Sequence, residues 1–111
     1  MSYSVYPTPE FKRLLKKLNK KYPSLKADLQ KLVKILKEDP ASGVHLGHNI
    51  YKMRMTITSK GKGKSGGARV VTYLVNEDRE VYLVFIYDKS QLENIAKEQV
   101  FELLKKAGLI R

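Results

Sequence analysis

The spacing of apolar residues changes once along the chain, and this change constrains the fold more than any other feature. Between residues 9 and 39 apolar side chains recur every three or four positions, which is typical of helices with one buried face. From residue 51 they alternate with polar side chains, which is typical of a half-buried strand. The two patterns occupy separate blocks, so we predict an α+β fold with the helices against one face of a sheet.

Two helices are predicted in the first block. Pro9 suits the first position of a helix, and Pro23 ends it. Ser24 can cap a second helix, which the Asp-Pro pair at residues 39 and 40 ends. These two helices are therefore predicted to form a helical hairpin.

Strands are predicted on both sides of this hairpin. A short N-terminal strand is expected over residues 2–6, and residues 41–47 have the composition of a turn. Three further strands are expected after that turn, over residues 51–58, 68–75 and 81–87. Because their connections are short, we predict that these three strands form an antiparallel meander.

A C-terminal helix is predicted to complete the chain. Ser90 and Glu93 match the S-x-x-E capping pattern, so the helix should begin near residue 91, and Gly108 should end it. The chain has 111 residues and no evident linker or repeat. We therefore predict a single domain over residues 1–111.

The charge of the chain indicates an anionic partner. Lys and Arg number 22 against 11 Asp and Glu, and no acidic residue lies between Pro40 and Asn76. Nucleic acid is the commonest partner of such a protein. The chain has no cysteine, which excludes disulfides and thiolate metal sites, and its two histidines have no carboxylate close in sequence. No apolar run approaches the roughly 20 residues that cross a bilayer, so we expect a cytoplasmic protein without a membrane partner.

The lysine- and glycine-rich segment over residues 59–71 resembles nucleotide-binding motifs only superficially. Its glycines satisfy G-x-G-x-x-G, but they lead into a predicted strand, whereas that motif must open a helix. A P-loop would need glycine where Thr58 stands. Phosphodiester binding explains both residue types, because lysines attract the anion and glycines let the backbone approach it. We therefore expect Lys60, Lys62 and Lys64 to bind RNA.

Three segments together resemble the RelE/HigB toxins of bacterial toxin–antitoxin pairs, and specifically the HigB-like branch. They are YKMRM at residues 51–55, KGKGKSGGARVVTYLV at 60–75 and VYLVFIYDKSQLENI at 81–95. The resemblance implies a microbial-ribonuclease-like fold and a ribosome-dependent endoribonuclease that cuts mRNA in the A site of the 70S ribosome. It also implies inhibition by a separately encoded antitoxin. The family chemistry is metal-independent attack of a ribose 2′-OH on the adjacent phosphate, with no small-molecule cofactor.

The resemblance implies catalytic roles for five residues. Lys52 and Arg54 match paired cations on one strand, and Arg69 matches the arginine that opens the next. Lys89 matches a basic position after the last strand, and Tyr87 would orient the nucleophile or the phosphate. A cluster of cations would lower the pKa of Tyr87 and Lys89 and so favour them as bases.

The chain departs from RelE at two positions, which leaves the general base open. Ser90 stands where RelE has a second arginine, and Ala96 stands where RelE has a tyrosine. Two other functions are compatible with the same residues. One is a ParE-like toxin that inhibits DNA gyrase, and the other is a basic RNA- or ribosome-binding module without catalysis.

Overall fold

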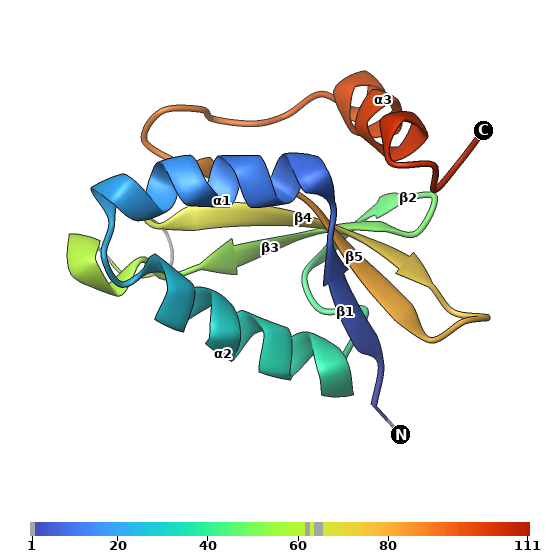
Figure 1. Ribbon diagram of the computed structural model, residues 1–111, viewed down its shortest axis with the longest axis horizontal. Helices are drawn as coiled ribbons and strands as arrows, with labels where there is room; N and C mark the ends of the chain where they lie inside the picture. Colours follow the sequence, from blue (N-terminus) through green and yellow to red (C-terminus); the bar gives the residue numbers. More distant parts are fainter. Residues whose placement is uncertain (1, 62, 64–65) are drawn as a thin grey trace.

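The protein folds into a five-stranded sheet that is covered by helices on both faces (Figure 1). The computed structural model describes residues 2–61, 63 and 66–111, and structural statements refer to these residues. The elements in chain order are β1 (Ser4–Pro7), α1 (Pro9–Lys21), α2 (Leu25–Glu38), β2 (Val44–Gly47), β3 (Ile50–Met55), the 3-10 turn η1 (Thr58–Lys60), β4 (Ala68–Val75), β5 (Glu80–Asp88) and α3 (Lys97–Lys106). The α+β fold with an N-terminal strand, a helical hairpin and a C-terminal helix is confirmed.

The N-terminal hairpin forms as its capping residues predict. The Oγ1 of Thr8 accepts a hydrogen bond of 3.2 Å from the backbone N–H of Phe11, and Pro9 occupies the first turn of α1. The side chains of Glu10 and Arg13 pair across that turn at 2.7 Å. α1 ends two residues before Pro23, because proline cannot continue the helical hydrogen bonds.

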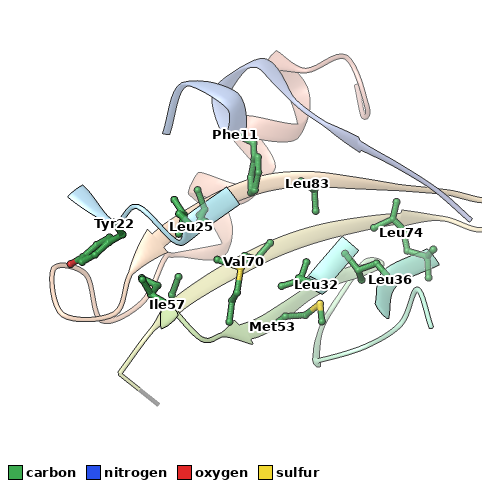
Figure 2. Close-up of a cluster of buried hydrophobic side chains, with 14 residues drawn as sticks. Phe11, Tyr22, Leu25, Leu32, Leu36, Met53, Ile57, Val70, Leu74 and Leu83 are labelled. Carbon is green, nitrogen blue, oxygen red and sulfur yellow. The ribbon is translucent and has the colours of Figure 1, made fainter. Parts of the chain in front are cut away.

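The larger core lies between this hairpin and the sheet. Phe11 points from α1 toward the strands, and Leu32 and Leu36 of α2 lie over Met53 and its neighbours (Figure 2). Phe11 and Leu36 are fully buried. The predicted alternation of β3 is confirmed here, because Tyr51, Met53, Met55 and Ile57 all belong to this side.

The third helix covers the opposite face, so the prediction that the helices share one face is wrong. Val100 and Leu104 of α3 pack with Val71 and Val84, whereas Val70, next to Val71 in β4, belongs to the core under α1 and α2. Adjacent strand residues point to opposite faces, so the two clusters lie on opposite sides of the sheet. The apolar content of both faces of β4 and β5 required this second cover.

The third helix also begins later than its capping pattern predicts. α3 starts at Lys97 with Ala96 as its N-cap, and residues 89–96 run back along the sheet without regular structure (Figure 1). Ser90 is diverted from capping, because its N–H and its hydroxyl both donate to Asp88, at 3.0 and 2.8 Å. A hydrogen bond to the side chain two positions earlier has replaced the predicted helix cap.

Two strands extend the predicted meander into a five-stranded sheet. The strand order is β1-β5-β4-β3-β2, with β1 parallel to β5 and the other neighbours antiparallel. The segment predicted as a turn contains β2, which pairs with the start of β3 through a hairpin. His48 and Asn49 form its tip with φ of 52° and 62°, as a tight hairpin turn requires.

A bulge in β5 controls which face its last residues occupy. Thr72 pairs with Leu83, whereas Val71 pairs with Phe85, so Val84 is an extra residue in β5. Leu83 and Ile86 both belong to the core under α1 and α2 although three positions separate them. The bulge therefore turns Tyr87 to the α3 side.

The start of β4 packs tightly against the end of β3. A Cβ atom added to Gly67 would lie 2.1 Å from the carbonyl oxygen of Met55. The carbonyl of Gly67 also accepts a hydrogen bond of 3.0 Å from the N–H of Lys89. Within the described part of the chain, no helix has the length and apolar character that crossing a membrane requires.

Replacing Gly67 by Ala should destabilise the fold strongly. The new methyl group would meet backbone, which must shift, so we expect a loss of about 3 kcal/mol or more in the free energy of unfolding. Gly108→Ala is the matched control, because nothing lies within 4 Å of its added Cβ and only its φ of +74° is unfavourable. That control should cost about 1 kcal/mol. Equal denaturation midpoints for the two variants would contradict the close contact at Gly67.

Candidate nucleic-acid interface and active site

Three of the predicted site residues lie in one row across the sheet. Arg54 of β3 pairs directly with Arg69 of β4, which pairs directly with Tyr87 of β5. Their neighbours Met53, Val70 and Ile86 belong to the core under α1 and α2, so the row faces the opposite side. We call Arg54, Arg69 and Tyr87 the arginine row. The structure thus brings together three residues that are 15 and 18 positions apart in the chain.

The two arginines of this row face each other at a cost to the sheet. Directly paired residues have Cβ atoms about 5 Å apart, and like charges at that distance are unfavourable. Arg54 is exposed, whereas Arg69 is 7% exposed and donates from Nη1 to its neighbour's carbonyl, that of Ala68, at 3.2 Å. An anion placed between two guanidinium groups would remove the repulsion and accept hydrogen bonds from both. The strand pairing therefore places two cations side by side, where one phosphate can contact both.

Tyr87 occupies the inner end of the row. Its side chain is 5% exposed, and its hydroxyl makes no hydrogen bond to any described residue. Burial raises the pKa of Tyr87 above its usual value, and the charge of Arg69 opposes this only in part. The expectation that neighbouring cations lower this pKa is therefore wrong for Tyr87. The phenol stays protonated at neutral pH and is a hydrogen-bond donor.

Lys52 lies on the same face as Arg54, two residues earlier in β3. Its Nζ donates to the Oδ1 of Asn94 at 3.3 Å, and Asn94 comes from the irregular segment before α3. Sequence reasoning did not identify Asn94, because an amide in a polar loop carries no signal. Its contact holds the lysine near the sheet, beside the arginine row.

Lys89 follows β5 at the same end of the sheet as the arginine row. Its side chain is half-buried, and its Nζ donates to the carbonyl of Glu93 at 2.9 Å. Its backbone N–H is bound to Gly67, two residues before Arg69. The structure therefore places Lys89 close to the row in the sheet, with its ammonium group engaged by the following loop.

Lys60 does not join the arginine row. Its ammonium group forms an ion pair of 2.8 Å with the buried carboxylate of Asp88 and lies 5.4 Å from the centre of the Tyr22 ring, on the side of α1. The carboxylate raises the pKa of Lys60. Lys62 and Lys64, the other two predicted RNA-binding lysines, lie outside the described residues.

A second cationic surface covers the outside of α1 and α2. The acidic side chains there are mostly engaged, since Glu10 pairs with Arg13 and buried Asp28 accepts from Thr58 and Ser24. We call the exposed lysines of both helices the helix lysines: Lys12, Lys16, Lys17, Lys20, Lys21, Lys26, Lys31, Lys34 and Lys37. Four of them line a groove of about 490 Å³ between the helices, namely Lys12, Lys16, Lys20 and Lys26.

Replacing Arg54 by Gln should stabilise the free protein, because the change removes the like charge opposite Arg69. We expect Tm to rise by about 1–5 °C in a buffer without multivalent anions. Sulfate should stabilise the wild type more than the variant, since it would bind between the two arginines. Arg111→Gln is the control for charge removal alone. A lower Tm for Arg54→Gln than for this control would contradict the repulsion.

Comparison with known proteins identifies the family. The sequence model of the RelE toxin of the RelE/RelB toxin–antitoxin system matches residues 4–110. The structure is similar to that of an arginine-to-alanine double mutant of E. coli toxin RelE in the free state, with a TM-score of 0.64 and 18% sequence identity over 96% of this chain and 97% of that one. The structural likeness supports the same fold, and the sequence match covers nearly the whole chain. This chain, in which two arginines and a tyrosine line up on an α+β sheet, therefore belongs to the RelE family of toxins from toxin–antitoxin systems.

Proposed function

We propose that this toxin is a ribosome-dependent endoribonuclease of the HigB-like branch, which inhibits translation by cutting mRNA. The observation that carries the proposal is the direct pairing of Arg54 with Arg69, next to Tyr87. Membership in the RelE family supports it. A phosphodiester bound across the two arginines would explain why two cations are paired at this place.

In the proposed reaction a ribose 2′-oxygen attacks the adjacent phosphorus atom. The new bond to the 2′-oxygen forms as the bond to the 5′-oxygen breaks, which leaves a 2′,3′-cyclic phosphate and a 5′-hydroxyl. The 2′-hydroxyl loses its proton and the leaving 5′-oxygen gains one. Negative charge increases on the nonbridging oxygens in the transition state, where Arg54 and Arg69 would stabilise it without a metal ion.

Lys52 and Lys89 would bind the RNA backbone on either side of the reacting phosphate. Lys52 is held by Asn94, and Lys89 is held at the end of β5, so both ammonium groups lie on loops or strands that border the row. Tyr87, protonated and buried beside Arg69, would orient that guanidinium and donate a hydrogen bond when RNA binds. In this scheme Lys52 and Lys89 bind the RNA, whereas Arg54 and Arg69 stabilise the charge that develops in the reaction.

The helix lysines support a partner larger than a single RNA strand. They lie on α1 and α2, on the other side of the sheet from the arginine row. A single RNA strand bound to the arginine row would therefore not neutralise their charge. Lysines four apart on a helix repel each other, and Lys12, Lys16 and Lys20 have that spacing. The A site of the 70S ribosome would present RNA to both surfaces and would place the activity in the cytoplasm. The antitoxin that the family implies would bind the toxin and hold it inactive.

Inhibition of DNA gyrase is the alternative function on the same scaffold. It requires no pair of cations aimed at one phosphate, so the arginine row favours RNA cleavage. A basic module without catalysis would bind RNA with a similar dependence on salt. Supercoiling assays and analysis of RNA ends separate the three functions, because only the nuclease leaves cyclic phosphates.

Replacing Arg69 by Ala should abolish cleavage while RNA binding persists. We expect the rate of cleavage on programmed ribosomes to fall by about 10²–10³, as for other donors that stabilise developing charge. Mapping of mRNA ends on translating ribosomes measures this rate, and circular dichroism checks folding. Arg111→Ala is the control and should cut normally. Full activity of the Arg69 variant would remove the proposed role of the row, and blocked gyrase with intact mRNA would establish the alternative.

Neutralising three helix lysines should weaken ribosome binding without changing the chemical step. The variant changes Lys12, Lys16 and Lys20 to Gln, and the control changes Lys97, Lys105 and Lys106 of α3 to Gln. Each phosphate contact contributes about 0.7 to the slope of log K against log salt for single strands, so the first variant should lower that slope by about 2. Cleavage at saturating ribosome should be unchanged. Equal ribosome affinities for variant and control would contradict the second RNA surface.

A further inference from the structure

A buried carboxylate lies directly behind the arginine row. Asp88 follows Tyr87 in β5 and pairs with Ala68, the residue before Arg69. Its side chain is on the α1 side of the sheet and its exposure is 1%, so it cannot touch RNA bound to the row. Asp88 therefore lies between Tyr87 and Lys89 in the chain and one position from Arg69 across the sheet, and all three belong to the proposed active site.

Three separate segments donate hydrogen bonds to this carboxylate. Lys60 of η1 donates from Nζ at 2.8 Å, and Ser90 donates from its N–H and its hydroxyl. The hydroxyl of Tyr22, at the C-terminal end of α1, donates to the other carboxylate oxygen. In Figure 2 this hydroxyl points away from the centre of the apolar core. We call Asp88, Lys60, Tyr22 and Ser90 the Asp88 cluster.

The same cluster also holds the beginning of β4. The Nζ of Lys60 donates a second hydrogen bond of 2.9 Å to the carbonyl of Gly66, three residues before Arg69. The next carbonyl, that of Gly67, binds the N–H of Lys89. Lys60 and Asp88 thus connect the residues just before β4 with the last residue of β5. Arg69 and Tyr87 pair with each other at the next position along these two strands.

Stability alone does not explain a buried ion pair at this place. Removing two charges from water costs free energy that their attraction only partly returns, and a well-packed apolar pair is often equally stable. What an ion pair with several hydrogen bonds provides is direction, because each bond restricts the position of the groups that it joins. A site that stabilises developing charge depends on such restriction, and a misplacement of 1 Å can cost about 10² in rate.

We propose that Asp88 and Lys60 are positioning residues, which fix the entry to β4 and the exit from β5 so that Arg69 and Tyr87 meet at the reacting phosphate. This inference rests on the proposed function, since it assigns a role in the same active site. The proposal gives different roles to basic residues that look alike in the sequence. Lys52 and Arg54 would contact RNA, whereas Lys60 would act from behind the sheet.

The test compares Asp88→Asn and Lys60→Met with the wild type and with Lys105→Met, a surface lysine whose ion pair with Glu102 is 3.6 Å long and exposed. Single-turnover cleavage on saturating ribosomes gives the chemical rate, and a titration gives ribosome affinity. We expect both cluster variants to lose at least about 10-fold in rate with affinity changed less than about threefold. Lys60→Arg keeps the charge and its donors, so it should restore most of the rate. Lys105→Met should match the wild type.

A purely structural role would give a different result. Folded Asp88→Asn and Lys60→Met proteins with the wild-type chemical rate, measured well below their Tm, would overturn the proposal. If Asp88→Asn does not fold, the comparison of Lys60→Met with Lys60→Arg decides the question in the same way, because both keep the carboxylate.

A second readout separates this inference from the proposed function. The NMR signal of the Arg69 Nε–H group reports the surroundings of the guanidinium whether or not RNA is cut. If the wild type cuts no RNA, the proposed function fails, and a displaced Arg69 signal in Lys60→Met would still support positioning. An unchanged signal would overturn positioning as well.

Discussion

The alignment of β3, β4 and β5 is the constraint on which the rest of the structure depends. Backbone hydrogen bonds between antiparallel strands fix residue against residue, and a slip of one position would turn every side chain to the other face. Here the alignment brings Arg54, Arg69 and Tyr87 into one row. If β5 alternated regularly through Val84, without the bulge, Tyr87 would fall on the same face as Leu83 and would lie under α1. The bulge is therefore part of the site.

Like charges lie side by side at two places on this scaffold. The arginine row places like charges opposite each other, and the helix lysines repeat along α1 and α2 with their acidic neighbours already engaged. Both arrangements are unfavourable in the free protein. Proteins carry such unfavourable groups where function needs them. The fold tolerates them because apolar cores on both faces of the sheet stabilise it.

Two buried carboxylates hold described residues between β3 and β4, Asp28 at Thr58 and Asp88 at Lys60. Asp28 of α2 accepts hydrogen bonds from the N–H of Thr58 at 2.9 Å and from its hydroxyl at 2.5 Å, where the segment between these strands begins. Asp88 binds Lys60, which in turn binds Gly66 near the segment's end. These hydrogen bonds lower the pKa of each carboxyl against the opposing effect of burial, so both remain charged at neutral pH. The bonds are lost only when pH falls below the ordinary range of an aspartate.

The sequence by itself determined the class of fold, the helical hairpin and four of the five strands, and the family resemblance singled out the residues of the arginine row. The helices and strands follow from local rules, because hydrophobic spacing sets which face of an element is buried and prolines end helices. It could not show that α3 covers the second face, that residues 44–47 form a strand or that Ser90 binds Asp88 instead of capping a helix. It also could not separate Lys60 from the lysines that face solvent. Each of these depended on which groups meet in the folded chain, and only the tertiary structure decides that, because a buried charge must find its partner wherever the fold places one.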